Sequence, residues 1–207
     1  MIAVIDYGIG NVFSLVSSLK SLGQDVVFTK DKDLIRKADR VILPGVGAFA
    51  DAAALLESTG MGQLVKELAA EGKPLMGICL GMQLLFDRSF EYGEHQGLGL
   101  IPGDVVPMLG TVDAGLKIPQ MGWNSLHFEK ADCPVFADTK EGDYVYFVHS
   151  YYATNCAESV VCTTDYSLPV TAAVWKDNVI GCQFHPEKSG EVGLRILKNF
   201  CEMETRA

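Results

Sequence analysis

One cysteine in this sequence has the surroundings of a catalytic nucleophile. Cys79 stands at the centre of the motif GICLG, residues 77–81, with a glycine two positions before it and another two positions after it. The apolar run at residues 75–78 predicts a strand, and a helical stretch is predicted to begin near Met82. A sharp strand-to-helix turn pushes its central side chain outwards and leaves no room for neighbouring Cβ atoms, which explains the glycines. We expect Cys79 to lie at such a turn, where a helix dipole favours the thiolate.

The alternative interpretation is that Cys79 is a small buried apolar residue, as most free cysteines are. The remaining five cysteines lack flanking glycines and are predicted to be core thiols. They are Cys133, Cys156, Cys162, Cys182 and Cys201. Their irregular spacing contains no CxxC pair, which indicates free thiols in a reducing compartment.

A cysteine that attacks an amide needs a base, and His185 has the best setting for one. It opens the motif His185-Pro186-Glu187 after an apolar run. Proline biases the preceding residue towards extended backbone, and residues two apart in an extended segment face the same way. Glu187 can therefore fix the imidazole tautomer and stabilise the charged ring, as the third member of a triad does.

The other three histidines are weaker candidates for the base. His149 is the main rival because it could point into a pocket, but it has no carboxylate close in sequence. His95 falls in a stretch rich in glycine and charge and is predicted to be a solvated loop residue. His127 is predicted to be structural. A thiolate, an imidazole and a carboxylate could instead bind zinc, although their spacing matches no known zinc signature.

Attack on an amide carbonyl places negative charge on oxygen, which backbone N–H groups can stabilise. The N–H of Leu80, directly after the nucleophile, is one candidate donor. A second should come from the Pro-Gly-Val-Gly segment at residues 44–47, and specifically from Val46 or Gly47. The alternative for this segment is an ordinary turn.

The elements around these residues indicate an α/β fold. Apolar runs at residues 2–5, 26–28, 41–43 and 75–78 are typical of buried parallel strands. Helical periodicity separates the first two, with Gly23 placed to end that helix, and a second helix is predicted at residues 61–70. This alternation predicts three layers, with a largely parallel central sheet flanked by helices.

The second half of the chain changes character. Apolar runs at residues 143–153, 159–163, 170–176 and 179–184 follow one another without long helices, which favours an antiparallel extension of the sheet. Asp177-Asn178 suits a hairpin turn, and Ser189 is the expected N-cap of a final amphipathic helix. We expect a single domain over residues 1–207.

Composition excludes several classes of function. The chain of 207 residues carries 17 basic and 26 acidic side chains, a formal charge of −9, which disfavours nucleic acid and anionic lipid as partners. No apolar run approaches the roughly 20 residues that span a bilayer. The N-terminus lacks the pattern of a secretory signal, so a cytoplasmic location is expected.

Three motifs in order resemble the class I, triad-type glutamine amidotransferases. They are PGVG at residues 44–47, GICLGMQ at 77–83 and HPE at 185–187. The resemblance implies a flavodoxin-like fold, no cofactor, and a triad of Cys79, His185 and Glu187. It also implies a pocket for L-glutamine, formed by these further residues: Gly45, Gly47, Gln83, His149, Ser150 and Tyr151.

Longer stretches are similar to the glutaminase subunits of imidazole glycerol phosphate synthases over essentially the whole chain. These stretches are DYGIGN at residues 6–11, PGVGAF at 44–49, PQMGWN at 119–124 and FHPEKS at 184–189. The resemblance implies a heterodimer with a (β/α)8 cyclase subunit. That partner uses the ammonia to make imidazole glycerol phosphate and AICAR in histidine biosynthesis, and glutamine hydrolysis is weak until it binds its nucleotide.

The same resemblance assigns five residues to the partner interface: Asn11, Met121, Trp123, Asn124 and Lys188. A dinucleotide site at Gly8-Ile9-Gly10 is an alternative for the first loop, but Phe13 replaces the third glycine of that fingerprint. Rival functions remain: an amidotransferase subunit of a different synthase, a γ-glutamyl hydrolase, or a noncatalytic regulatory subunit.

Overall fold

The protein is built around one eight-stranded sheet. The computed structural model describes residues 1–8, 12–130 and 132–203. The strand order is β2-β1-β3-β4-β14-β13-β12-β9. The strands are β1 (Ile2–Ile5), β2 (Val26–Thr29), β3 (Arg40–Leu43), β4 (Leu75–Ile78), β9 (His127–Phe128), β12 (Val160–Asp165), β13 (Pro169–Lys176) and β14 (Val179–Cys182).

The sheet is parallel at one side and antiparallel at the other. Strands β2, β1, β3, β4 and β14 all pair in parallel. β13 then pairs antiparallel with β14, and β12 and β9 continue in that manner. The predicted change of character in the second half is confirmed, with one correction: β14 was grouped with the antiparallel strands, yet it joins β4 in parallel and carries the chain towards the carboxyl ends of β3 and β4.

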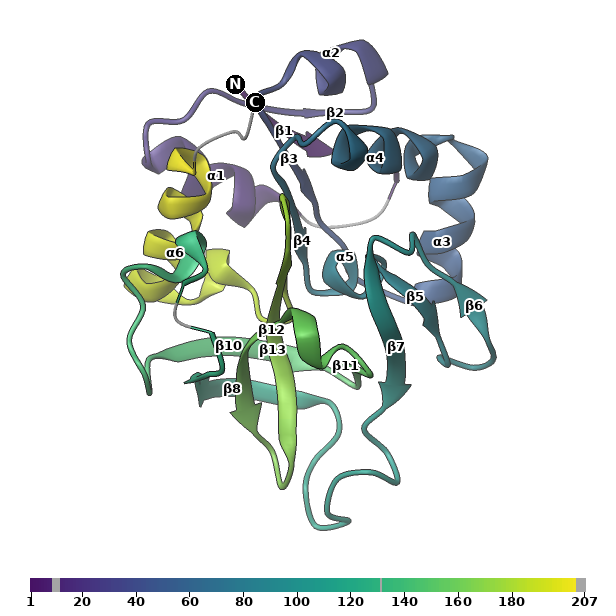
Figure 1. The fold of residues 1–207 in the computed structure, drawn as a ribbon, viewed down its shortest axis with the longest axis vertical. Helices are drawn as coiled ribbons and strands as arrows, with labels where there is room; N and C mark the ends of the chain where they lie inside the picture. Colours follow the sequence, from purple (N-terminus) through teal and green to yellow (C-terminus); the bar gives the residue numbers. More distant parts are fainter. Residues whose placement is uncertain (9–11, 131, 204–207) are drawn as a thin grey trace.

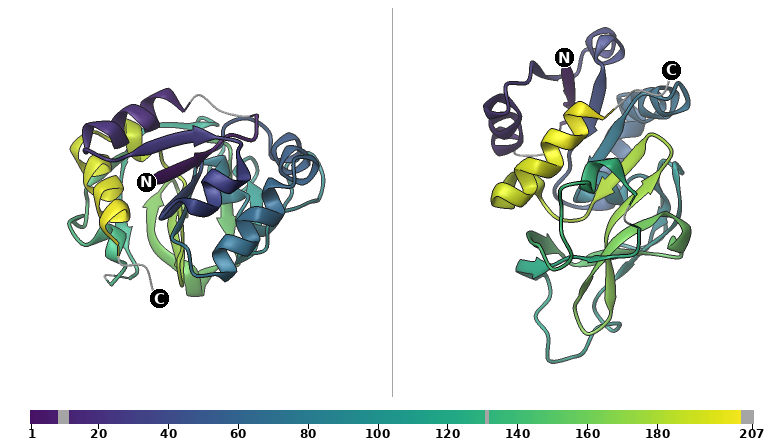
Figure 2. Two further views of the ribbon diagram at one scale, coloured as in Figure 1. Left: turned by 90° about the horizontal axis from the view of Figure 1, so that it is seen from above. Right: turned by 60° about the vertical axis from the view of Figure 1, so that its left-hand side comes forward.

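Helices cover both faces of the parallel part (Figures 1 and 2). Apolar side chains of α1 (Phe13–Ser21) and α6 (Gly190–Glu202) pack on one face. Those of α2 (Lys32–Lys37), α3 (Phe49–Ser58) and α4 (Met61–Ala70) pack on the other. The three predicted layers are therefore present. Burial of these two apolar faces is the main driving force that holds the layers together.

Two smaller sheets complete the chain. A ribbon pairs β8 (Gln120–Ser125) with β10 (Tyr144–His149). A second sheet has the order β11-β7-β5-β6. Its members are β5 (Phe86–Ser89), β6 (His95–Gln96), β7 (Ile101–Pro107) and β11 (Tyr151–Thr154). Short 3₁₀ turns occupy Pro134–Phe136, Ala157–Ser159 and Pro186–Lys188.

Several local predictions are corrected by these elements. Residues 143–153 were expected to form one strand, but the chain passes at Ser150 from the ribbon into the second sheet. His95 lies in β6 rather than in a loop. Helices α2 and α3 were not predicted, although Asp31 caps α2 by accepting from the backbone N–H groups of Asp33 and Leu34.

Other predictions are confirmed. Helix α4 begins and ends where expected, Gly23 follows α1 with φ of 76°, and Asp177 forms the hairpin turn with φ of 54°. Ser189 does precede α6, but its hydroxyl does not cap that helix; it donates to the backbone oxygen of His185 and accepts from the backbone N–H of Tyr146. Among the described helices, none is both long and apolar enough to cross a membrane.

Candidate active site

Cys79 lies at the turn between β4 and α5 (Leu80–Gln83), with φ of 55° and ψ of −114°. This backbone conformation is uncommon for a residue with a side chain. The two flanking glycines are required by contact. A Cβ on Gly81 would lie 1.9 Å from the backbone oxygen of Leu43, and one on Gly77 would lie 2.6 Å from that of Gly81. The predicted turn is confirmed.

The helix after this turn is short and begins slightly earlier than the sequence indicated. α5 has four residues and begins at Leu80, not near Met82. One turn of helix aligns few peptide dipoles, so the dipole contribution to the thiolate is smaller than expected. The charged form of the sulfur must depend mainly on neighbouring side chains.

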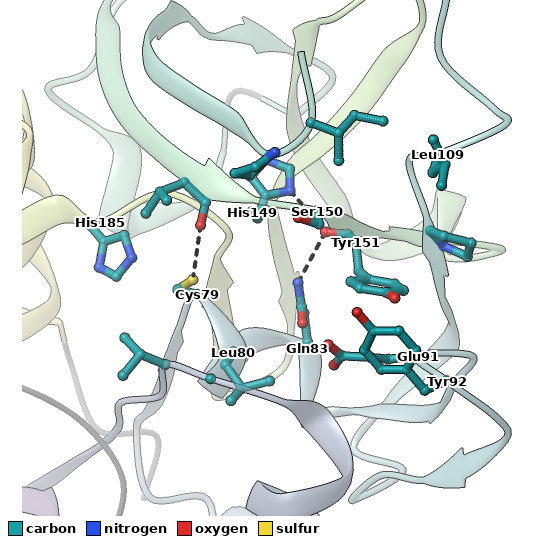
Figure 3. A pocket seen from close by; sticks show the side chains of 16 residues that line it. Cys79, Leu80, Gln83, Glu91, Tyr92, Leu109, His149, Ser150, Tyr151 and His185 are labelled. Atoms are coloured by element: carbon teal, nitrogen blue, oxygen red, sulfur yellow. Dashed lines mark hydrogen bonds between the residues drawn. The ribbon is translucent and has the colours of Figure 1, made fainter. Parts of the chain in front are cut away.

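His185 is held by Glu187 behind the nucleophile. Its Nδ1 lies 2.8 Å from Oε1 of Glu187, and both side chains are over nine-tenths buried. A carboxylate only accepts, so Nδ1 carries a proton and Nε2 is the atom free to exchange one. Nε2 is buried and has no hydrogen-bond partner among the residues described. Figure 3 shows this ring beside the Cys79 sulfur.

The charge of His185 depends on these two neighbours. Burial by itself lowers the pKa of His185, but the side chains of Cys79 and Glu187 outweigh burial and raise that pKa from 6.5 to about 9. A charged imidazole beside sulfur favours the thiolate, and it can give its proton to a departing amine. The geometry therefore suits a cysteine nucleophile with an acid-base partner.

Cys79 and His185 open into a pocket of about 670 Å³, a size typical of small-molecule sites. Nine of the residues proposed from sequence line it: Val46, Gly47, Cys79, Leu80, Gln83, His149, Ser150, Tyr151 and His185. Figure 3 shows the cysteine and histidine at one end and Glu91 and Tyr92 at the other. Gly45 is not part of this lining. It lies against the start of α5, where its Cβ would meet the Gly81 nitrogen at 2.8 Å.

His149, the rival base, has a different environment. Its Nδ1 lies 2.8 Å from the backbone oxygen of Tyr151, an acceptor, so Nδ1 carries the proton. Burial lowers the pKa of His149 to about 4. The ring is therefore neutral near neutral pH and has no carboxylate behind it in the described structure. His185 fits the role of base better.

The remaining histidines lie elsewhere. His127 is half exposed and lies between Glu141, at 2.7 Å, and the hydroxyl of Ser125, at 3.3 Å. His95 lines a separate groove beside α3. Within residues 1–8, 12–130 and 132–203, no three His, Cys, Asp or Glu side chains form a group that could hold a metal ion.

The residues proposed for a partner interface have different environments. Met121 and Trp123 are 65% and 54% exposed on β8. Lys188 follows Glu187, with its ammonium 6.0 Å from the centre of the Tyr146 ring. Asn124 is used within the chain, since its amide donates to the backbone oxygen of Asp165. Asn11 and the preceding Ile9-Gly10 lie outside the described residues.

Sequence reasoning missed several residues near the site, including three with polar side chains. Glu91 and Tyr92 line the far end of the pocket, and Glu91 also accepts from the backbone N–H of Phe49 at 2.7 Å. They belong to a loop with no motif of its own. Gln183 is fully buried behind Cys79. Its position two residues before His185 in extended backbone was the available signal.

Comparisons with known proteins show the family of this chain. The family model described as glutamine amidotransferase class-I matches residues 3–203. The chain belongs to the class-I glutamine amidotransferase family. Two curated relatives of this amidotransferase are both named imidazole glycerol phosphate synthase subunit HisH. The one from Caldanaerobacter subterraneus subsp. tengcongensis is 51% identical, covering 98% of each chain, and the one from Wolinella succinogenes is 48% identical, covering 98% of this chain and all of the relative.

Solved structures show that the fold of this amidotransferase is shared at low sequence identity. A crystal structure titled glutamine amidotransferase superposes with a TM-score of 0.75 at 20% identity, covering 98% of both chains. The structure of PurLQS from Thermotoga maritima gives 0.74 at 22% identity over 97% of both chains. These similarities confirm the α/β class-I fold with its antiparallel strands.

Proposed function

We propose that this amidotransferase is the glutaminase subunit of an imidazole glycerol phosphate synthase in histidine biosynthesis. It hydrolyses L-glutamine to L-glutamate and ammonia, and a (β/α)8 cyclase subunit uses the ammonia to form imidazole glycerol phosphate and AICAR. The observation that carries the hydrolysis is the His185–Glu187 pair beside Cys79 in one pocket. The relatives, about half identical over nearly the full chain, support the choice of synthase.

In the first half of the reaction, the Cys79 thiolate attacks the amide carbon of glutamine. Charge builds on the amide oxygen, and the N–H of Leu80, with one from Val46 or Gly47, donates to it; that all three residues line the pocket supports this role. His185 passes its Nε2 proton to the amide nitrogen, the C–N bond breaks, and ammonia leaves. A glutamyl thioester on Cys79 remains.

In the second half, His185 takes a proton from water, and the hydroxide attacks the thioester carbon. The C–S bond then breaks, glutamate leaves, and the thiolate is restored. Glu187 keeps the Nδ1 proton in place throughout, so only Nε2 exchanges. The Glu91 carboxylate, at the far end of the pocket, gives the α-ammonium group of glutamine a partner of opposite charge.

The position of the exposed ribbon supports a partner that receives ammonia. Met121 and Trp123 face outwards on β8, and Met121 pairs with Val148 on β10. Val148 also lines the pocket, with its backbone oxygen 3.9 Å from the Cys79 sulfur. An apolar surface that continues into the reaction site suits a docked protein, because docking there would exclude water from the released ammonia.

The test measures glutamate release by the chain alone, with the cyclase subunit, and with the cyclase and its nucleotide substrate. We expect slow release alone and an increase of about 5- to 150-fold with both additions, as for a coupling free energy of about 1–3 kcal/mol. A control uses the cyclase subunit denatured before mixing. Rapid release that neither addition changes contradicts the proposed synthase, whereas no release under any condition contradicts the glutaminase itself.

A further inference from the structure

A second polar side chain, Gln183, reaches the Cys79 sulfur from inside the protein. It follows β14 and is fully buried. Its Nε2 lies 3.9 Å from Sγ of Cys79, and its Oε1 accepts from Nε2 of Gln83 at 3.0 Å. The mechanism above uses neither contact. Burying an amide costs solvation free energy unless its polar atoms find partners, so the contacts of Gln183 indicate what its side chain does.

The orientation of this amide is fixed by the chain around it. The backbone oxygen of Tyr151 can only accept, and Nε2 of Gln83 lies 3.1 Å from it. The NH₂ group of Gln83 therefore faces both Tyr151 and Gln183. Gln183 must turn its oxygen towards that donor, which leaves its own NH₂ facing Cys79. These hydrogen bonds fix which end of the Gln183 amide faces Cys79, whatever the protonation state of the sulfur.

Two polar contacts of the sulfur, with Val148 and with Gln183, favour opposite protonation states. The backbone oxygen of Val148, 3.9 Å from Sγ, can accept a proton from the thiol but has nothing to offer a thiolate. The Gln183 amide can donate to either form and is stronger towards the anion. Loss of the thiol proton thus ends the Val148 contact and strengthens the Gln183 contact. Such contacts also tighten when charge develops, so a length of 3.9 Å in the resting protein is consistent with this role.

We propose that Gln183 is a positioning residue that donates an amide N–H to the Cys79 sulfur and holds the nucleophile in its charged, correctly oriented form. Its donor is present at every pH. The titratable groups that face the sulfur or its pocket are His185, two positions after Gln183, Tyr7 after β1, His149 on β10, Tyr151 on β11, and Glu91 and Tyr92 after β5. The consequence for glutamine hydrolysis rests on the proposed function, but the contact with sulfur does not.

The test is the pH dependence of Cys79 alkylation by iodoacetamide, followed by mass spectrometry of the peptide that contains Cys79. In Gln183→Met, an apolar side chain of similar length replaces the amide. We expect the midpoint of the pH profile to rise by about one unit, so that alkylation below the midpoint slows roughly tenfold. A profile that overlays that of the unmodified chain overturns the proposal, whether or not the chain shows glutaminase activity.

A matched control removes the polar group of another buried side chain, a hydroxyl in the eight-stranded sheet. Thr164 on β12 is fully buried and its hydroxyl has no partner in the described part of the chain, so Thr164→Val should leave the alkylation profile unchanged. If Gln183→Met does not fold, as judged by circular dichroism, Gln183→Glu keeps the shape and an acceptor for Gln83. Its carboxylate opposes the thiolate, so the midpoint should again rise. An unchanged midpoint in Gln183→Glu also overturns the proposal.

Discussion

The turn after β4 and the end of β14 place two cysteines side by side with opposite chemistry. The backbone N–H of Cys79 donates to the backbone oxygen of Cys182 at 2.7 Å, and both residues are buried. Cys182 is the last residue of β14, in register with Ile78, and burial raises the pKa of its thiol well above the ordinary value. Cys79 lies one step beyond, where the backbone turns and presents the sulfur to His185 and Gln183.

The comparison teaches that burial does not separate a core thiol from a nucleophile. What differs is the set of partners. Near Cys182 the charged or polarisable neighbours are Cys133 and Glu187, and both disfavour a thiolate. At the turn, an imidazole and an amide face the sulfur. Cys182 is in register with Ile78, so Cys79 lies only one residue further along the sheet, yet its sulfur has a reactive environment and that of Cys182 an inert one.

The strongest test of this comparison replaces each cysteine in turn. Cys79→Ala removes the nucleophile, so glutamate release should fall by at least about 10⁴-fold while folding and partner binding persist. Cys182→Ala removes only a buried sulfur and should keep most of the activity, with a loss of about 1–2 kcal/mol in unfolding free energy. A coupled enzymatic assay measures glutamate release, and urea denaturation measures the unfolding free energy. Retained activity in Cys79→Ala removes this residue from the mechanism.

The next test addresses the partner that makes the turn reactive. In Glu187→Gln the neutral amide can offer a donor as well as an acceptor to Nδ1, and the charged imidazole loses its counter-ion. We expect kcat to fall about 10²- to 10⁴-fold with a smaller change in KM. Glu141→Gln, beside the exposed His127, is the matched control and should keep full activity. Equal effects of the two changes contradict the assigned role of Glu187.

The glycines test whether the turn itself is fixed by contact. Gly81→Ala forces a Cβ to within 1.9 Å of the Leu43 backbone oxygen, which cannot rotate away. The unfolding free energy should fall by more than about 3 kcal/mol, beyond the usual cost of overpacking. Gly115→Ala, where a Cβ meets no atom within 4 Å, should change it by less than about 0.5 kcal/mol. Similar melting temperatures for the two variants contradict this account.

The smallest effect concerns pH and stability. Because the pKa of His185 is raised from 6.5 to about 9 in the folded chain, its contribution to stability is complete below pH 6.5 and is lost as pH rises through about 9. The difference in unfolding free energy between the unmodified chain and His185→Gln should shrink over that interval. Urea denaturation at several pH values measures it. A difference that stays constant across the interval shows that the charged imidazole adds no stability.

The sequence predicted the parts of the site that local rules determine. The glycines around Cys79 and the proline after His185 act within a few residues, so the turn and the extended segment follow from the motif. The change of sheet at Ser150 was missed, because an unbroken apolar run does not show where strand partners change. The Gln83–Gln183 contact was also missed. It joins residues 100 positions apart, and only the packing of β14 beside β4 brings them together.

The contact between Gly81 and the Leu43 backbone oxygen has a consequence for how this enzyme can be altered. The backbone at Gly81 packs directly against the backbone at Leu43, so no side-chain rotamer or substitution can change the spacing between them. The spacing between the end of β3 and the start of α5 is thus limited by van der Waals contact between the two backbone segments. Changes in reactivity, whether selected or engineered, therefore have to come from the His185 imidazole and the Gln183 amide, because the backbone of the turn cannot be shifted.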